Sequence, residues 1–191
     1  MKDKVKKIIF IVIMYLIYVN FFKGYYSYIP TIPIYPNNEK DLILLKEKIS
    51  ERTYEDVNFF FKTNQSIVPA FKPYVKDSEE ELEKIATSHN FIILFFKYLI
   101  NRRRPYQINE NINPLNTETS QTPAYPAGHA YQAQLVASHL SKKYPDKEDL
   151  FNKIALECDK CRVKAGLHYI SDGEFSRKLF KMFSNFPIPI M

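Results

Sequence analysis

The sequence has only two cysteines among its 191 residues. Cys158 and Cys161 are too few for a tetrahedral zinc site unless histidines join them, and their spacing is not that of a zinc finger. A Cys-x-x-Cys pair also occurs in redox sites and in local disulfides of exported proteins. Because free cysteine is usually buried, we expect two helical thiols, one of them in the core.

Alternating patterns typical of β-strands are nearly absent, and the chain contains no internal repeat. Apolar residues recur instead at helical spacing. The length suits one domain with a core and is short for two. We therefore predict an all-α fold, a helical bundle.

The basic charge is concentrated at the start of the chain. Residues 1–23 hold five of the 27 basic residues and one of the 21 acidic ones, which leaves the remainder at about +2. A nucleic-acid-binding protein more often carries a basic face on its folded part. We therefore expect no nucleic-acid partner.

The same segment contains the longest apolar run, residues 8–22, interrupted only by Asn20. Fifteen residues lie near the lower limit for a membrane span, and a signal peptide looks similar, although no small-x-small cleavage site follows. Residues 1–23 are therefore predicted to be a signal anchor or a signal peptide. A buried N-terminal helix is the alternative.

This prediction sets the expected location and domain boundaries. The lysine-rich end is expected in the cytoplasm, with the domain on the other side, either anchored by one span or secreted. Three prolines indicate an extended linker over residues 24–37, because proline cannot continue a helix. The folded domain is expected over residues 38–191.

Helix signals recur through this domain. Asn38 is expected to cap the first helix, and Ser78 to Glu81 form a capping box before a long helix that Pro105 stops. A loop is expected over residues 111–125. Three more helices are predicted: one over about 128–143, one capped by Asp146 and ending near Gly166, and one opened by a capping box at residues 171–174.

The first pattern that suggests chemistry is K-x6-R-P, formed by Lys97, Arg104 and Pro105. Seven residues make about two helical turns, so the two cations are expected on one helix face, with Arg102 and Arg103 pointing elsewhere. The alternative is a solvated basic helix end that complements the helix dipole.

The second pattern is Pro126-Ala127-Gly128-His129, at an expected helix start. Glycine lets an anion approach the backbone, where free N–H groups and the helix dipole favour negative charge. His129 is placed to donate a proton to a leaving oxygen. A capping turn with an incidental histidine is the alternative.

The third pattern joins Arg162, His168 and Asp172 at offsets of six and four. A guanidinium binds a phosphate or a similar oxyanion well. A histidine can attack or transfer protons near neutral pH, and an aspartate can hold one ring N–H so that the other nitrogen is free to react. Alone, this triplet is weak evidence.

Together, K-x6-R-P, a P-x-G-H motif and R-x5-H-x3-D resemble the signature of the type-2 phosphatidic-acid phosphatase superfamily, which includes bacterial acid phosphatases and vanadium haloperoxidases. The resemblance covers about residues 78–183. The flanks Tyr-Pro-Ala-Gly-His-Ala and Ala-Gly-Leu-His-Tyr-x-Ser-Asp look most like the soluble acid-phosphatase branch.

The resemblance implies a role for each matching residue. His168 would be the nucleophile that forms a phosphohistidine, Asp172 would orient it, and His129 would protonate the leaving group. The phosphoryl oxygens would be bound by side chains and backbone of Lys97, Arg104, Arg162, Gly128 and Ala127.

Two residues depart from the family pattern. Ala127 replaces a serine and so removes one hydroxyl donor, and Cys161 replaces the serine that usually precedes the arginine of the third motif. Loss of one oxyanion donor can reduce a rate by about 10²–10³-fold.

The expected function is a phosphatase that hydrolyses phosphate monoesters without a metal or other cofactor, since three cations can neutralise the phosphoryl charge. The expected partners are a small phosphorylated substrate, with lipid phosphate as a second class, and the membrane through residues 8–22. Three alternatives remain open: a vanadate-dependent haloperoxidase, a lipid phosphatase at the membrane surface, and an impaired phosphate-binding remnant.

Overall fold

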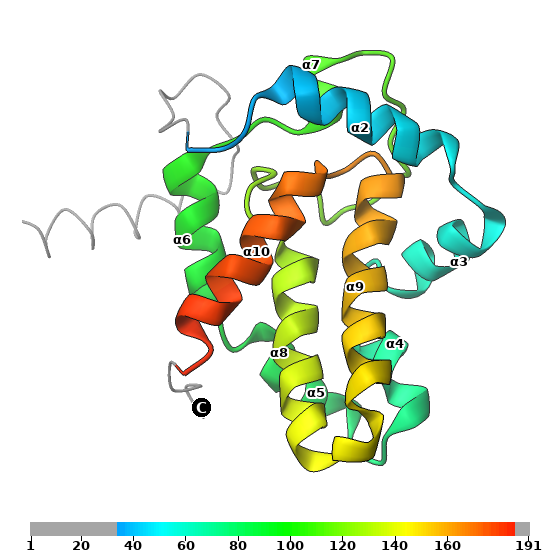
Figure 1. Ribbon diagram of the computed structural model, residues 1–191, viewed down its shortest axis with the longest axis vertical. Coiled ribbons are helices and arrows are strands. Elements are labelled where there is room, and N and C mark those ends of the chain that lie inside the picture. Colours follow the sequence, from blue (N-terminus) through cyan, green and yellow to red (C-terminus); the bar gives the residue numbers. More distant parts are fainter. Residues whose placement is uncertain (1–33, 186–191) are drawn as a thin grey trace, which may run out of the picture.

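The computed structural model describes residues 34–185, and within them it contains helices and no strand (Figure 1). The predicted all-α fold is confirmed. The predicted anchor over residues 1–23 and most of the predicted linker lie outside the described residues. Among the helices of residues 34–185, none is both long and apolar enough to cross a bilayer.

The helices follow one another without long interruptions except between α7 and α8. Their bounds are α2 Asn38–Ser50, α3 Tyr54–Lys62, α4 Val68–Phe71, α5 Glu79–Thr87, α6 Asn90–Ile100, α7 Pro105–Ile108, α8 Gly128–Lys143, α9 Glu148–Lys164 and α10 Ile170–Phe183, with short 3-10 turns at Lys72–Tyr74 and Pro145–Lys147. The predicted loop over residues 111–125 is free of helix.

Helices α8 and α9 form the centre of the bundle and are joined by the short turn at Pro145–Lys147 (Figure 1). Helix α10 packs on α8, and α2 lies across one end of the bundle against α9 and α10. Helices α4 and α5 pack at the other end against α9 and α8. The segments that carry the three motifs therefore all border α8 or α10.

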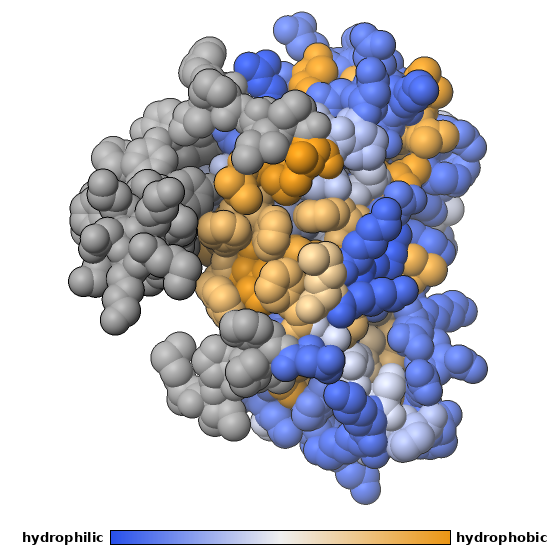
Figure 2. All heavy atoms as spheres, turned by 60° about the vertical axis from the view of Figure 1, so that its left-hand side comes forward, coloured by the Kyte–Doolittle hydropathy of each residue, from blue (hydrophilic) through white to orange (hydrophobic). Residues whose placement is uncertain are grey.

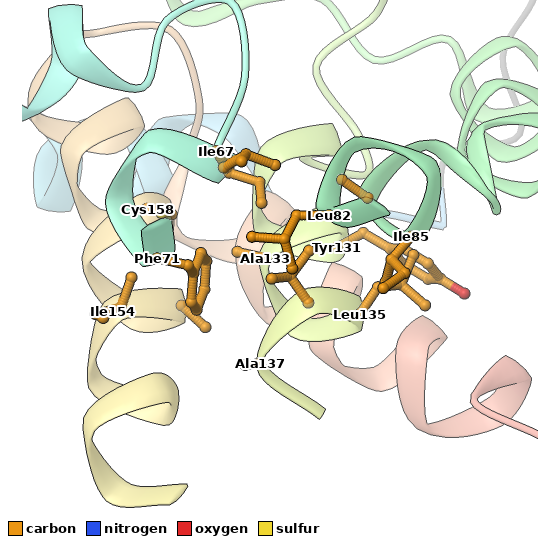
Figure 3. Packing of buried hydrophobic residues seen from close by; sticks show 14 of the residues in the cluster. Ile67, Phe71, Leu82, Ile85, Tyr131, Ala133, Leu135, Ala137, Ile154 and Cys158 are labelled. Carbon is orange, nitrogen blue, oxygen red and sulfur yellow. The ribbon is translucent and has the colours of Figure 1, made fainter. Parts of the chain in front are cut away.

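The main core lies where α4 and α5 pack on α8 and α9 (Figure 3). Phe71, Leu82 and Ile154 are buried there, and each apolar side chain of this size contributes about 1.5–3 kcal/mol on burial. Tyr131 of α8 is fully buried, and its hydroxyl lies 3.0 Å from Nδ1 of His89. His89 therefore has a structural role.

Both cysteines are buried in α9 as free thiols. Burial raises the pKa of both Cys158 and Cys161, that of Cys161 to about 11. Both are therefore protonated at neutral pH, as expected for core thiols and not for a redox pair.

The long helix predicted after Ser78 is wrong, because the structure has two helices there. Helix α5 ends at Thr87, and α6 starts after His89. The His89 ring is hydrogen-bonded to the Tyr131 hydroxyl of α8. Helix α6 then ends at Ile100, five residues before Pro105, because Asn101 adopts a left-handed conformation with φ of +52°. Its N–H bonds the Lys97 carbonyl oxygen at 2.7 Å, which closes the helix.

Three predicted helix caps also differ from those in the structure. Asn37, not Asn38, caps α2 by accepting hydrogen bonds from the next turn. Helix α9 follows a 3-10 turn that contains Asp146, which does not cap it. Helix α10 begins at Ile170, where Asp172 accepts the N–H of Tyr169 at 2.9 Å in place of the expected cap by Ser171.

Helix α6 presents part of an apolar face to the surface. Figure 2 brings the α6 side of Figure 1 forward, and apolar side chains gather over one area of it. Phe91 is 48% exposed, and five further apolar or aromatic side chains of α6 are partly exposed: Leu94, Phe95, Phe96, Tyr98 and Leu99. The opposite face buries Ile92, Ile93, Lys97 and Ile100.

We predict that Gly173→Ala destabilises the fold by about 1–3 kcal/mol. A Cβ at Gly173 would lie closer than 3.0 Å to the Asp159 carboxylate, which is held by Arg177. Urea unfolding of the full chain measures the change. Gly128→Ala is the matched control, because its Cβ would meet ordinary contacts at 3.7 and 3.9 Å and should change stability by less than about 1 kcal/mol. Equal effects would contradict the packing argument.

Candidate active site

One cavity of about 220 Å³ lies between α6, α8 and the segments before α8 and α10. Five of the eight sequence-predicted residues line it: Lys97, Arg104, Gly128, His129 and His168. They come from three motifs separated by up to 71 positions, so the fold brings them together. The remaining lining residues are Gln65, Asn90, Ile93, Leu94, Thr119, Thr122 and Gln132.

A larger cavity of about 440 Å³ lies elsewhere, between α2, α9 and α10. Its charged lining residues are engaged in ion pairs, such as Lys48 with Glu51 and Arg177 with Asp159. None of the motif residues lines it. We therefore place the chemistry at the smaller cavity.

Lys97 and Arg104 reach the cavity by different routes. Lys97 is a buried residue of α6 whose Nζ donates to the Pro123 carbonyl oxygen. Arg104 lies beyond the helix end, so the prediction that the two cations share a helix face was wrong. Its Nε donates to the Thr122 carbonyl oxygen at 3.0 Å, and its Nη1 donates to the Leu167 carbonyl oxygen at 3.0 Å.

The His168 ring is held at both nitrogens. Its Nδ1 lies 3.1 Å from Oδ2 of Asp172, and its Nε2 lies 3.0 Å from Nη1 of Arg104. A guanidinium only donates, so Nε2 is the acceptor and the proton is assigned to Nδ1, facing the carboxylate. This is the tautomer in which Nε2 carries a lone pair into the cavity.

The site strongly favours a neutral His168. Burial lowers the pKa of His168 well below its ordinary value, and the charges of Arg104 and Lys97 lower it further. Burial also lowers the pKa of Lys97 well below its ordinary value, with a further contribution from Arg104. Burial is the main cause of both shifts, and the neighbouring cations add to it.

His129 is tied to the segment after α3. Its Nε2 lies 3.1 Å from the Asn64 carbonyl oxygen, which can only accept, so the proton is assigned to Nε2. Burial lowers the pKa of His129 well below its ordinary value, and Arg162 adds to this effect. His129 is therefore a neutral ring beside the cavity, and it can act as a general acid only after it gains a second proton.

Arg162 does not line the cavity. Its Nη2 donates to the carbonyl oxygen and to the hydroxyl of Thr63, and its guanidinium lies 4.6 Å from the Phe60 ring centre. Within residues 34–185 no carboxylate lies within 4 Å of Arg162 or of Lys97. The buried Nε of Arg162 has no hydrogen-bond partner.

Ala127 also lies outside the cavity lining. It is fully buried, and its N–H donates to the Asp172 carbonyl oxygen at 3.3 Å. Its own carbonyl oxygen accepts from Ser176 at 2.8 Å. Ala127 thus ties the start of α8 to the first turn of α10.

Arg102 is the main residue that sequence reasoning missed, and the prediction that it points away from the site was wrong. It is fully buried, and its Nη1 donates to Oδ1 of Asp172 at 2.6 Å. Its Nη2 donates to Asp41 at 2.8 Å, and its guanidinium lies 3.8 Å from the Tyr169 ring centre. Because α6 ends at Ile100, helical spacing does not apply to Arg102.

Asp172 is consequently held from three directions. Arg102 binds one carboxylate oxygen, while His168 and the Tyr169 N–H bind the other. Burial raises the pKa of Asp172, and Arg102 is the strongest influence that opposes the rise. No local pattern in the sequence distinguishes Arg102 from its exposed neighbour Arg103.

Metal ligands are not gathered at this cavity. Within residues 34–185, one group could offer a histidine and two carboxylates to an ion: Asp77, Glu81 and His139, which contact one another between α5 and the far part of α8. Asp77 already pairs with Lys143 and accepts from the Tyr144 hydroxyl at 2.7 Å. The group lies away from the motif residues.

No protein-family model matches the chain, and no curated protein matches its sequence. Among solved structures, the chain is similar to a transmembrane PAP2-type phosphatidylglycerolphosphate phosphatase from Bacillus subtilis, with 19% sequence identity and a TM-score of 0.53. The similarity covers 80% of this chain and 87% of that one. It shows that the two chains share a helical fold, in agreement with the fold that the motifs predicted. The closer likeness to soluble acid phosphatases stays a prediction.

We predict that Arg102→Gln destabilises the protein by about 3–5 kcal/mol, because it leaves Asp172 and Asp41 buried without their counter-charge. Urea unfolding measures the loss. Arg103→Gln, at the exposed neighbouring position, should cost less than about 1 kcal/mol. A loss of similar size in both variants would contradict the role assigned to Arg102.

We also predict that the free energy of unfolding falls as the pH falls below 6.5, the ordinary pKa of histidine. There the unfolded chain binds a proton that buried His168 does not, so stability changes by up to about 1.4 kcal/mol per pH unit. Asp159, with a pKa raised to about 6, acts in the opposite direction. The measurement therefore compares the wild type with His168→Gln between about pH 7 and pH 5. Identical slopes would contradict a neutral, buried His168.

Proposed function

We propose that this chain is a phosphatase that hydrolyses phosphate monoesters through a phosphohistidine intermediate, without a metal ion. The observation that carries the proposal is the arrangement of His168. Asp172 holds its Nδ1–H, and its Nε2 lone pair faces a cavity lined by Lys97 and Arg104. A neutral imidazole beside buried cations is suited to attack an anionic phosphoryl group.

The first chemical step follows from this geometry. Nε2 of His168 forms a bond to phosphorus while the bond from phosphorus to the leaving oxygen breaks. The electron pair goes to that oxygen, which takes a proton from His129 in its doubly protonated form, stabilised by the bound phosphate anion. Attack requires Arg104 to release Nε2, and a phosphoryl oxygen offers Arg104 a charged acceptor in exchange.

The second step regenerates the enzyme. A water molecule gives a proton to His129 and attacks phosphorus, and the bond from phosphorus to Nε2 breaks with its electron pair returning to His168. The proton on Nδ1 of His168 stays there throughout, hydrogen-bonded to the Asp172 carboxylate. The negative charge of Asp172 stabilises the positive ring of the intermediate. Inorganic phosphate leaves, His168 returns to its neutral form, and His129 is again protonated for the next turnover.

Three buried cations support the charge of the transferring group. Lys97 and Arg104 line the cavity, and Arg162 lies close enough to lower the pKa of both His129 and His168. The first residue of α8, Gly128, adds the positive end of a helix dipole. Ala127 contributes no hydroxyl, so we expect a slower enzyme than one with serine there.

Lipid phosphate is a second candidate substrate class. The structurally similar B. subtilis protein is named for a lipid phosphate. In this chain, Leu94 of α6 lines the cavity, and the partly exposed apolar side chains of α6 continue from it. An apolar surface beside the site favours a substrate presented at a membrane surface.

Phosphate release by the full chain in detergent tests the proposal. We predict turnover of p-nitrophenyl phosphate in the presence of EDTA, and a loss of more than about 10³-fold in His168→Ala. His139→Ala, a histidine of α8 outside the cavity, should keep its activity. Turnover that EDTA abolishes, or that survives in His168→Ala, would contradict the proposal.

A second arm separates the two histidines. His129→Ala should retain more activity on p-nitrophenyl phosphate, whose leaving group needs little protonation, than on an alkyl phosphate. With radiolabelled phosphate ester it should accumulate an acid-labile protein phosphate that His168→Ala lacks. The same loss on both esters would argue against His129 as the acid.

A further inference from the structure

The cavity has two chemically different parts. Its inner part holds the cations and histidines. The other polar side chains of the lining are all uncharged: Gln65, Asn90, Thr119, Thr122 and Gln132. Among the described residues, no carboxylate lines the cavity, and Ile93 and Leu94 are the only apolar side chains that do. The part that would surround a leaving group is therefore neutral and rich in hydrogen-bonding groups.

Asn90 and Gln132 stand at defined positions relative to the phosphate-binding residues. Asn90 opens α6 and lies two helical turns before Lys97, a rise of about 10 Å. Gln132 lies one turn after Gly128 on α8, a rise of about 6 Å. Asn90 lies on the same side of α6 as Lys97, and Gln132 lies on the same side of α8 as Gly128. Along the helix axes, the two amides are therefore separated from the phosphate-binding residues by about 6–10 Å, roughly the length of a small alcohol.

The two amides are fixed to each other. Nε2 of Gln132 donates to Oδ1 of Asn90 at 2.9 Å, and both side chains are partly exposed. This bond uses one donor and one acceptor site, which leaves several N–H groups and oxygen lone pairs of the pair for other partners. A pre-oriented pair of neutral donors and acceptors is suited to hydroxyl groups, which both donate and accept.

We propose that Asn90 and Gln132 form a leaving-group subsite that selects phosphate monoesters of small polyhydroxy alcohols, such as glycerol or a sugar. The inference rests on the proposed phosphatase function and deepens it. The cavity volume of about 220 Å³ has room for a phosphate with a short leaving group. Pockets that bind larger organic ligands have volumes of about 300–1,000 Å³. The polyhydroxy group can belong to a free phosphate or to a lipid headgroup.

A purely structural role for the pair makes a different prediction. The bond between Asn90 and Gln132 also joins α6 to α8, so its loss could displace Lys97 from His129. Such a displacement would impair every phosphate ester alike. A subsite for hydroxyl groups affects only esters whose leaving group carries them.

The test measures phosphate release by the full chain in detergent from three esters. These are phenyl phosphate, glycerol 3-phosphate and micellar phosphatidylglycerolphosphate. We expect Gln132→Met and Asn90→Leu to lower kcat/KM for a polyhydroxy ester by about tenfold or more each, with less than about threefold change for phenyl phosphate. Gln134→Met is the matched control, because Gln134 lies two residues away on α8 and outside this cavity.

The outcomes separate the two proposals. If the wild type releases phosphate from none of the three esters, the phosphatase function itself fails. If phenyl phosphate is turned over and the variants lower all substrates equally, the subsite is overturned while the phosphatase stands. A selective loss on glycerol 3-phosphate supports a free substrate, and a selective loss only on the micellar ester supports the same subsite with a lipid headgroup.

Discussion

The ion pair between Arg102 and Asp172 is the interaction on which the site depends. Arg102 is fully buried and joins the turn after α6 to the first turn of α10 and, through Asp41 and Asn38, to the start of α2. Burying a guanidinium and two carboxylates is costly unless each is fully bonded, and here the hydrogen bonds and the Tyr169 ring compensate. The orientation of the His168 ring is therefore set by a charge network that also closes the bundle.

The charges at the cavity are not paired in this way, unlike those around Arg102. Lys97 and Arg162 are buried without a carboxylate within 4 Å in the described part of the chain. Burial lowers the pKa of both His129 and His168, and the neighbouring cations lower it further. Such an arrangement destabilises the fold by itself, and an anion in the cavity would relieve it. Sites that sacrifice stability in this way are usually functional. The neutral amides Asn90 and Gln132 then add selectivity without adding charge.

Much of the fold and of the site was readable before the structure. Helical spacing gave the bounds of α8 correctly, because glycine and proline delimit it and its apolar residues keep one period. It failed between Ser78 and Pro105, where a contact between His89 and Tyr131 separates two helices and Asn101 ends the second. Arg102 and Arg104 were assigned to the wrong faces for this reason. Long-range contacts decided those positions, and periodicity contains no information about them.

The sequence by itself determined the helical class and the identity of the motif residues, since periodicity and residue type are local properties. Only the tertiary structure decided which of three successive arginines contacts His168, which binds Asp172, and which stays at the surface. It also decided that Arg162 and Ala127 support the cavity from behind and that two amides border it. The physical reason is that a cavity forms where distant segments pack together, and the direction of each side chain depends on where its helix ends.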